Sequence, residues 1–369
     1  MRRLWPVLLL LSCGGGGERT STGHLEAWVE EAPRYATRYT VLRSGDRTRL
    51  LVFGPAGRTD TVGDHELVPH GTIVSTSIGP EQVVVPLQRM VLLSTTHAAY
   101  IALLDQRAKV VGLAYPDQVR DSALQVALRA GHCTDVGSSE QPDREVLLAL
   151  RPDAVLGYPF GMTGLGAEMG GAPLIRVAEY LEPTPLARAE WLCFFGLLLG
   201  QEEMARQLFA GIEERYVAVR DRVDQGTAPT AVFFGSAWQG TWWVPGGGSY
   251  MNTLFRDAGG ELLFSDGDAA ANRAVDLESL LLEGDKARYW GMVVATEGEV
   301  TAELLSAGDA RLGILPPFAE DRLFAANSAK DDVFGRAYVE PDVVLKDLVH
   351  ILSPDLAPDH VPVYYHRLQ

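Results

Sequence analysis

The sequence predicts an α/β fold of two lobes joined by one long α-helix, with a small strand-rich extension on the N-terminal side. Short apolar runs alternate with helix-like stretches between residues 90 and 156, and again from residue 231 onward. This alternation is typical of parallel sheets covered by helices. Residues 186–224 separate the two regions and contain no strand candidate. The length of 369 residues also fits two or three globular units.

The composition excludes several classes of protein. The formal net charge of −16 makes the chain a poor candidate for coating nucleic acid, which requires a basic surface, and suggests a soluble protein repelled by anionic lipid. No apolar run is long enough to span a membrane as a helix. Three cysteines are too few for a disulfide scaffold or for a zinc site made of four thiolates.

The first residues have the layout of an export signal. Arg2 and Arg3 precede an apolar run at residues 4–11, which is too short to cross a bilayer. The following Leu-Leu-Ser-Cys, ending at Cys13, resembles a bacterial lipobox, in which the chain is cut before a cysteine that is then lipidated. We therefore expect residues 1–22 to be a lipoprotein signal and tether, with the rest of the chain outside the cytoplasm. An ordinary signal peptide with an incidental cysteine is the alternative.

Two cysteines remain, Cys133 and Cys193. In an oxidising compartment they could form a disulfide. Cys193 lies within a strongly apolar run at residues 191–195, which favours a buried thiol instead.

The elements follow from apolar periodicity and turn residues. Residues 38–53 and 59–85 are predicted to form short strands. The first lobe has predicted strands at 90–93, 110–113 and 153–156, and helices at 96–104, 123–130 and 145–150. The second lobe has predicted strands at 231–235 and 290–295, and helices at 250–258, 277–282 and 343–352.

The long helix is predicted at residues 201–224. Its apolar residues recur in steps of three or four, which places them on one face of a helix; they are Met204, Leu208, Ile212, Tyr216, Val219 and Val223. Gly226 and Pro229 follow and end the helix.

With these elements in place, the chain resembles the periplasmic substrate-binding proteins of iron–siderophore and cobalamin ABC importers. Three segments carry the resemblance: Ser94-Thr95-Thr96-His97 with the strand at 110–112, residues 145–155, and above all residues 180–200. Residues 242–250 are also similar to the branch of this family found in Bacteroidota-type bacteria. The resemblance covers about residues 70–369, and residues 24–69 look like the strand-rich addition of the same branch.

The resemblance implies an organisation and a function. It implies Rossmann-like lobes at residues 70–185 and 227–369, linking helices at 186–226 and an extension at 24–69. A ferric siderophore, or cobalamin or haem, would bind between the lobes and be delivered to an ABC permease with its ATPase subunits. We therefore expect a monomeric, lipid-anchored periplasmic binder with no catalytic residue, no cofactor and no metal ion of its own.

The resemblance also implies two docking residues. Family members use one glutamate per lobe to meet arginines of the permease, and by position these are Glu145 and Glu278. Each begins a short predicted helix that precedes a strand. The alternative is that each glutamate only stabilises the N-terminus of its helix.

Ligands of open α/β sheets bind at the carboxyl ends of the strands. Aromatic and polar residues that follow the predicted strands are therefore the candidate ligand contacts, because aromatic rings offer rigid apolar faces to a bulky ligand. They are Thr96, His97, Tyr115, Tyr158, Phe160, Trp238, Trp242, Trp243, Tyr250 and Glu297. For Trp242 and Trp243 the alternative is alternation in a strand, with one buried in the core. Arg273 and Arg322 could pair with ligand carboxylates or be solvated surface residues.

Two other functions remain open. Zinc and manganese importers share the two-lobe outline, and distant His and carboxylate residues could converge on a metal, although no metal-ligand spacing is present. An extracytoplasmic hydrolase needs only a pair of carboxylates, which 48 acidic residues allow. Gly161, Gly164 and Gly166 have the wrong order for a dinucleotide fingerprint and are expected to form a cleft loop.

Overall fold

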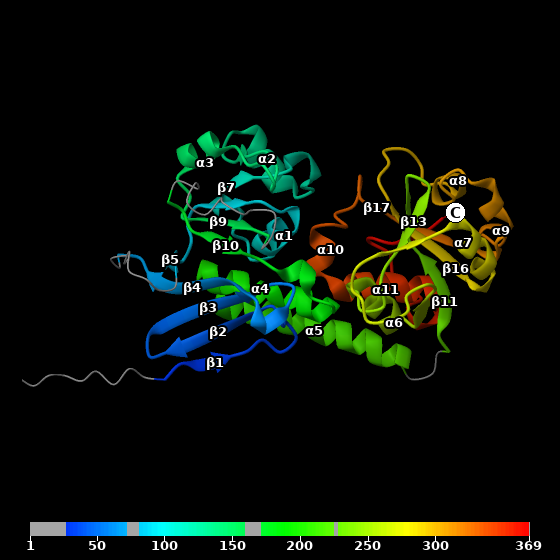
Figure 1. Ribbon diagram of the computed structural model, residues 1–369, viewed down its shortest axis with the longest axis horizontal. Coiled ribbons are helices and arrows are strands. Elements are labelled where there is room, and N and C mark those ends of the chain that lie inside the picture. The colour runs from blue at the N-terminus through cyan, green and yellow to red at the C-terminus, as the bar shows by residue number, and fades with distance from the viewer. Residues whose placement is uncertain (1–26, 72–80, 159–170, 225–227, 369) are drawn as a thin grey trace, which may run out of the picture.

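A computed structural model describes residues 27–71, 81–158, 171–224 and 228–368. A strand-rich extension and two α/β lobes are arranged around two helices, α4 and α5 (Figure 1). The α/β fold with two lobes is confirmed. Cys13 and the predicted signal lie outside the described residues, and so do Phe160 and the glycines at 161–166. Within the described ranges, no helix is both long and apolar enough to cross a membrane.

The extension is one five-stranded sheet in the order β1-β2-β3-β4-β5. Its strands are β1 (Val29–Glu31), β2 (Tyr39–Ser44), β3 (Arg47–Phe53), β4 (Thr61–Pro69) and β5 (Glu81–Val85). Strand β5 pairs in parallel with β4, so this sheet continues past residue 69, where the sequence places the boundary of the first lobe.

The first lobe is a parallel sheet in the order β10-β9-β6-β7-β8. Its strands are β6 (Met90–Leu92), β7 (Val110–Leu113), β8 (Thr134–Asp135), β9 (Ala154–Gly157) and β10 (Leu174–Arg176). Its helices are α1 (Thr95–Leu103), α2 (Ser122–Arg129) and α3 (Arg144–Leu150). Each predicted helix and strand of this lobe is confirmed to within one or two residues.

The second lobe has a sheet in the order β14-β11-β16-β17-β18, parallel except for its last strand. These strands are β11 (Thr230–Phe234), β14 (Gly260–Leu262), β16 (Tyr289–Val294), β17 (Leu323–Asn327) and β18 (His366–Arg367). The helices are α6 (Tyr250–Asp257), α7 (Leu277–Glu283), α8 (Ala302–Leu305), α9 (Pro316–Ala319), α10 (Arg336–Val339) and α11 (Pro341–Leu352). A small antiparallel sheet of β12 (Ser236–Trp238), β13 (Thr241–Val244) and β15 (Arg273–Val275) was not predicted.

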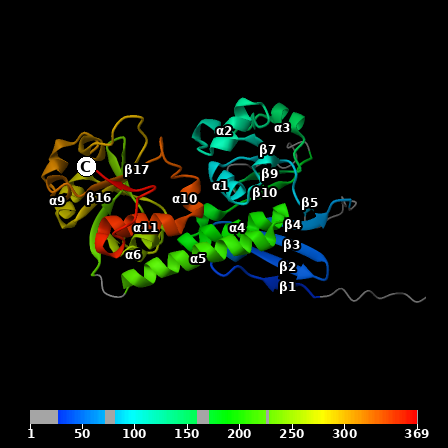
Figure 2. The ribbon, with the colours of Figure 1, turned by 180° about the vertical axis from the view of Figure 1, so that it is seen from behind.

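Two helices link the lobes, α4 (Pro185–Leu199) and α5 (Glu202–Asp224). Gly200 ends α4 with a left-handed φ of 68°, a conformation that glycine adopts at low cost. Seen from behind, α5 runs below both lobes (Figure 2). Its Phe209 and Ile212 belong to the core of the first lobe, and its Tyr216 and Val223 belong to the core of the second. The predicted long linking helix is therefore confirmed, and it contributes to both cores.

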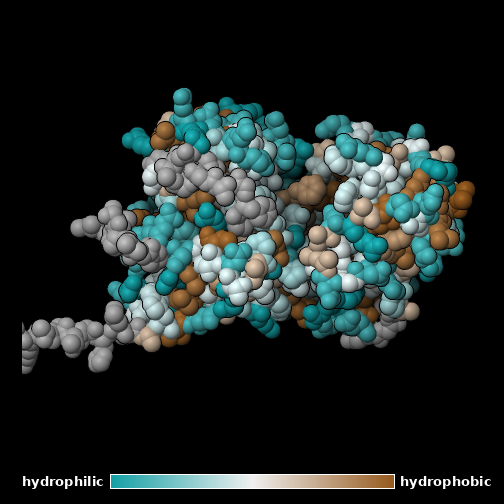
Figure 3. Space-filling view, viewed as in Figure 1, coloured by the Kyte–Doolittle hydropathy of each residue, from teal (hydrophilic) through white to brown (hydrophobic). Residues whose placement is uncertain are grey.

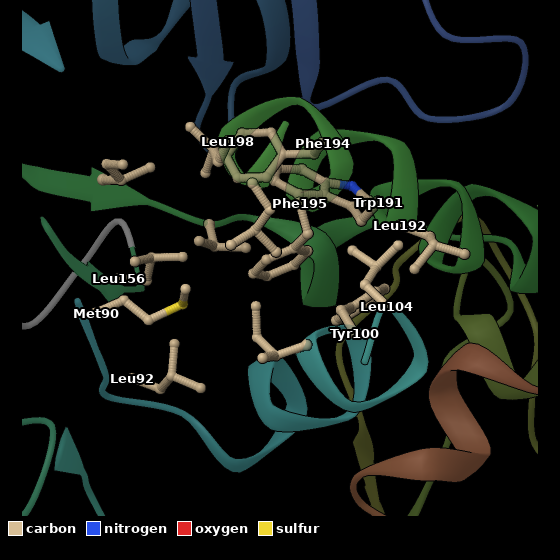
Figure 4. Close-up of a cluster of buried hydrophobic side chains, with 14 of the residues drawn as sticks. Met90, Leu92, Tyr100, Leu104, Leu156, Trp191, Leu192, Phe194, Phe195 and Leu198 are labelled. Atoms are coloured by element: carbon tan, nitrogen blue, oxygen red, sulfur yellow. The ribbon is translucent and has the colours of Figure 1, made fainter. Parts of the chain in front are cut away.

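Helix α4 is buried on nearly all sides. The extension sheet packs on one face through Tyr39, whose ring lies 4.8 Å from that of Trp191. On the other face Phe195 stacks on Tyr100 of α1 at 4.7 Å, within the cluster shown in Figure 4. A helix that is apolar all round needs cover on every side, and the extension provides it.

Two buried glutamates hold the segment between β1 and β2 against the linking region. Glu190 of α4 accepts hydrogen bonds from the backbone N–H groups of Arg34, Tyr35 and Ala36, each at 2.7 Å. Glu182 accepts from the backbone N–H groups of residues 37 and 38, each at 2.8 Å. Buried carboxylates are stable only with such partners, so these residues fix the extension in place.

Candidate ligand-binding cleft

Residues that follow the carboxyl ends of strands in both lobes line an interlobe cavity of about 260 Å³. Thr95 follows β6, Arg120 follows the first-lobe strand β7, and Asp332 follows the second-lobe strand β17; all three line this cavity. Arg120 donates a hydrogen bond from Nε to the carbonyl oxygen of Ser328 at 3.3 Å, across the two lobes. The molecular surface is hollowed between the lobes, with hydrophobic atoms inside the hollow (Figure 3).

Helix α10 of the second lobe brings the lobes together. It packs against α1 and α4, and it lies between the lobes in both views (Figures 1 and 2). Arg336 and Glu340 at its two ends form an ion pair at 2.8 Å and line the cavity together with Arg107 of the first lobe. The cavity therefore carries both positive and negative groups.

Arg188 of α4 connects the lobes. Its guanidinium donates from Nε to the carbonyl oxygen of Glu182 at 3.1 Å and from Nη2 to that of Tyr180 at 2.9 Å. The same guanidinium lies over the rings of Tyr250 and Tyr338 in the second lobe, at 4.2 and 5.1 Å from their centroids. This is a cation–π contact to two rings, held in place by backbone carbonyls.

Around the start of α1, next to the cavity-lining Thr95, the first lobe contains a chain of hydroxyl groups that ends on a carboxylate. Tyr158 follows β9, and its phenol oxygen lies 2.7 Å from Oγ of Ser94. Oγ of Ser94 lies 2.9 Å from Oγ1 of Thr96, which donates to Oε1 of Glu179 at 2.6 Å. Ser94 is the N-cap of α1, so the helix start sets the position of two members of the chain.

His97 and Glu179 form a buried pair next to this hydroxyl chain. His97 is fully buried, Glu179 is 2% exposed, and Nε2 of His97 is 3.7 Å from Oε2 of Glu179. Burial alone would raise the pKa of Glu179, but the nearby charge of His97 and the hydrogen bond from Thr96 outweigh it and hold this pKa below its usual value. Burial and the charge of Glu179 raise the pKa of Tyr158 to about 12.

The structure brings some of the predicted first-lobe contacts together. Thr96 and Tyr158 are half-buried members of the same hydroxyl chain, and neither lines the interlobe cavity. His97 is fully buried and has no exposed surface with which to touch a ligand in this conformation. Tyr115 is half-buried after β7, and its phenol donates to Glu140.

The second-lobe contacts are more scattered. Trp242 is 3% exposed and packs between Phe233 and Trp290, so it is a core residue, as the strand alternation allowed. Trp243 is half-buried on the other face of β13. Tyr250, at 7% exposed, contacts Arg188, whereas Trp238 and Glu297 are exposed at β12 and after β16.

Sequence reasoning missed several charged residues of this region. Arg120 and Asp332 line the cavity, Arg188 contacts both lobes, and Glu179 accepts a hydrogen bond from Thr96. Only Arg188 and Glu179 had a signal, since both belong to or adjoin the crossover segment at residues 180–200. Arg273 pairs with Asp266 at 3.7 Å on β15. Arg322 precedes β17 and therefore lies at the amino end of its strand, opposite to the strand ends that line the cleft.

The described residues contain no group of three or more His, Cys, Asp or Glu side chains that could hold a metal ion. Cys133 and Cys193 are both free thiols. The cavity is lined by arginine and carboxylate side chains together with Thr95 and apolar residues.

The two predicted docking glutamates occupy equivalent positions. Glu145 is the second residue of α3, whose N-cap is Asp143, and Glu278 is the second residue of α7, whose N-cap is Asp276. Both glutamates are exposed. The two lobes therefore present the same local arrangement, a capped short helix with an outward carboxylate in its first turn.

A family model described as periplasmic binding protein matches residues 90–290. The match covers more than half of the chain and includes strands of both lobes, so the chain belongs to the periplasmic binding protein family. The resemblance seen in the sequence is thereby confirmed. Proteins of this family work with ABC permeases.

Similar proteins agree with this assignment. The chain is 24% identical over 285 residues to an uncharacterized lipoprotein of Methanocaldococcus jannaschii. That alignment covers 73% of this chain and 66% of the archaeal protein, slightly less than two thirds of its length.

Solved structures share the fold at low sequence identity. A periplasmic heme binding protein from Pseudomonas aeruginosa is 18% identical with a TM-score of 0.59, covering 75% of this chain and 96% of that one. The triscatecholate siderophore binding protein FeuA from Bacillus subtilis, solved with ferri-bacillibactin, is 15% identical with a TM-score of 0.59, covering 77% and 99%.

Proposed function

We propose that this chain is an extracytoplasmic substrate-binding lipoprotein of an ABC importer. It binds a metal chelate, a ferric siderophore or else haem or cobalamin, in the cleft between its lobes and delivers it to a membrane permease. The protein has no catalytic role, and ATP hydrolysis belongs to other subunits. The observation that carries the proposal is a cleft built from strand ends of both lobes of a periplasmic binding protein.

The small volume of the cleft supports a mechanism in which the lobes move apart to admit the ligand. Pockets for drug-sized ligands have volumes of ~300–1,000 Å³, whereas the interlobe cavity has about 260 Å³. A bulky chelate therefore enters when the lobes separate, which requires breaking the contact between Arg120 and Ser328. The long helix α5 belongs to both cores and keeps this motion small.

The chemistry of the cleft supports a metal chelate over a bare zinc or manganese ion. Bare divalent ions need several converging His and carboxylate ligands. Arg107, Arg120 and Arg336 line this cleft, and Arg188 lies over two tyrosines where the lobes meet. Arginines suit the carboxylates of organic chelators, and tyrosines suit aromatic surfaces. The solved relatives that bind heme or ferri-bacillibactin agree with this class of ligand.

The proposal also includes a lipid anchor and two residues that contact the permease. Lipidated Cys13 would hold the protein at a membrane surface, in keeping with the lipoprotein from Methanocaldococcus jannaschii. Glu145 and Glu278 would meet basic residues of the permease, one on each lobe.

The test is a binding titration of the soluble chain starting at residue 27 with ferric siderophores, hemin and cyanocobalamin. Tryptophan fluorescence gives the saturation curve, and calorimetry confirms it because all three ligands absorb light. We expect saturable one-to-one binding of one ligand without turnover. Absence of binding to every chelate, or turnover of any of them, would contradict the proposal.

A further inference from the structure

A second hollow lies outside the interlobe cavity, between α5, α11 and the segment that follows α11. Its volume is about 470 Å³, against about 260 Å³ for the interlobe cavity. Helices α5 and α11 pack side by side along this hollow in both views (Figures 1 and 2). We call it the α5–α11 groove. Its volume falls within the ~300–1,000 Å³ of sites that bind small molecules.

Most residues that line the α5–α11 groove are apolar. Val219 of α5, Val349 of α11 and Leu356 lie along it. Val363 also lines it and is 47% exposed, although it is a large apolar side chain. Apolar side chains that gather in an exposed groove indicate a ligand with an apolar part of its own. The groove therefore suits a hydrocarbon chain.

Positive charge surrounds the apolar part of the groove. Arg215 and Arg222 of α5 and Lys346 of α11 line it. Among the described residues that line the groove, Asp342 is the only carboxylate, so the lining is net positive in a chain whose formal net charge is −16. Arg222 donates to the carbonyl oxygen of Leu356 at 3.2 Å, and Lys346 is exposed. This pattern complements an anionic head group attached to an apolar chain.

The carboxylate of Asp342 provides a second, independent observation. Asp342 is 5% exposed, and its Oδ2 accepts a hydrogen bond from Nε of Arg215 at 2.6 Å. Its Oδ1 is buried and has no hydrogen-bond partner within the described part of the chain. Burial raises the pKa of this carboxyl, although Arg215 opposes the shift. A buried acceptor without a donor is costly, so a ligand that offers a hydroxyl proton to Oδ1 gains affinity.

We propose that the α5–α11 groove binds a single-chain amphiphile that carries a phosphate and a neighbouring hydroxyl group, which is the chemistry of a monoacyl glycerophosphate lipid. The acyl chain lies on the apolar residues of the groove. The phosphate accepts hydrogen bonds from Arg222 and Lys346, and the hydroxyl donates to Oδ1 of Asp342. The groove shares no lining residue with the interlobe cavity, so this activity goes beyond the proposed function and does not depend on it.

The test is a calorimetric titration of the full-length chain carrying Cys13→Ser, which cannot bear an acyl group of its own. The probe is lauroyl lysophosphatidic acid, kept below its critical micelle concentration. Three further probes each lack one feature: dodecyl phosphate lacks the hydroxyl, monolauroyl glycerol lacks the phosphate, and glycerol phosphate lacks the chain. We expect saturable one-to-one binding of the lysophosphatidic acid and at least about tenfold weaker binding of each of the other three.

Two variants place the lipid in the groove. Ala218→Trp introduces a large side chain at an exposed position that lines the groove, and it should weaken lipid binding by at least about tenfold. Its matched control is Ala210→Trp, because Ala210 is also exposed on α5 but does not line the groove. Lys346→Glu should weaken binding by about fivefold or more, whereas Lys286→Glu, at an exposed lysine outside the groove, should not.

Equal affinity of Ala218→Trp and Ala210→Trp for the lysophosphatidic acid would overturn the inference, because the lipid would then bind elsewhere. Dodecyl phosphate or glycerol phosphate binding as tightly as the lysophosphatidic acid would overturn it too, since the hydroxyl or the chain would then contribute nothing. Absence of lipid binding to the starting protein would also overturn it and leave the chelate-binding function standing. Thermal unfolding by circular dichroism identifies a variant that has lost its fold, and Lys346→Glu tests the groove without altering its shape.

Discussion

The side chain of Arg188 contacts both lobes. Its two hydrogen bonds hold it on the first-lobe side, and its charge lies over Tyr250 and Tyr338 of the second lobe. We predict that Arg188→Met lowers the free energy of unfolding by about 2 kcal/mol, from the lost cation–π contact and hydrogen bonds. Chemical denaturation measures it.

The matched control for Arg188 is Arg206→Met on α5, which removes only exposed ion pairs with Glu202 and Glu203. Such pairs contribute ~0–1 kcal/mol. Equal losses of stability in the two variants would contradict a special role for Arg188.

Glu190 stabilises the extension by accepting three backbone hydrogen bonds. Its removal leaves three buried or half-buried N–H groups without their acceptor. We predict that Glu190→Ala costs about 3 kcal/mol of unfolding free energy, since each lost bond to a charged group is worth ~1.5–3 kcal/mol and water replaces part of it. Glu203→Ala, at an exposed position of α5, should change stability by less than about 0.5 kcal/mol. A Glu190→Ala protein as stable as the wild type would contradict this account.

At this scale the sequence predicted residue types better than residue roles. Tyr158 and Thr96 were selected because they follow strands, and the structure joins them in one hydroxyl chain. His97 satisfies the same rule, yet its side chain turns inward to Glu179, because the third residue of a helix need not face the strand ends. Arg120 and Asp332 meet only through tertiary packing of two lobes, which no local pattern contains.

At the scale of elements, the apolar helix α4 explains the strand-rich extension. Thirteen of its 15 residues are buried, including Trp191 and Phe194. A helix of this kind is stable only when both of its faces are covered. The extension sheet covers the face that the first lobe leaves open, through contacts such as Tyr39 with Trp191 and Phe194.

We therefore predict that deletion of residues 27–85 yields an aggregated or unfolded protein, because the deletion exposes a large apolar surface. The chain starting at residue 27 should give a cooperative thermal transition by circular dichroism. A soluble, cooperatively folding protein without the extension would show that the sheet is an independent appendage.

Regular elements were predictable where one periodicity dominated. The linking helix α5 was found because its apolar residues repeat in steps of three or four over its whole length. Helix α10 was not, because four residues give no periodic signal, although it sits between the lobes. The small sheet of β12, β13 and β15 was missed for a related reason: β15 pairs with β13 from 30 residues further along the chain, and its residues Arg273 and Ala274 are exposed.

At the scale of the whole molecule, the equivalent positions of Glu145 and Glu278 suggest that the permease contacts both lobes at the same time. We predict that Glu145→Lys with Glu278→Lys abolishes transport of the chelate in cells while leaving its affinity within about twofold, because both residues are exposed and distant in sequence from the cleft residues. Uptake of labelled chelate and calorimetry provide the two measurements.

The matched control for docking is Glu203→Lys with Glu214→Lys, which reverses two exposed charges on α5. It changes the net charge by the same amount, so a general electrostatic effect would appear in both proteins. Full transport by the Glu145 and Glu278 double variant would refute the docking assignment.

The central claim is that the chelate binds between the lobes, and the contact between Arg120 and Ser328 allows a direct test. The double variant Arg120→Cys with Ser328→Cys places one thiol on each lobe. A bifunctional reagent that forms a disulfide with each of these thiols would hold the lobes closed. Burial raises the pKa of Cys133 to about 11 and of Cys193 to about 12, so these native thiols react slowly.

The measurement is calorimetric binding of the chelate found by the titration to this double variant, before crosslinking, after crosslinking and after reduction. We predict that crosslinking lowers the affinity by at least about tenfold, because a chelate larger than the closed cavity cannot enter. Reduction should restore the affinity. Equal affinity in all three states would contradict the claim, because the ligand would then bind somewhere other than between the lobes.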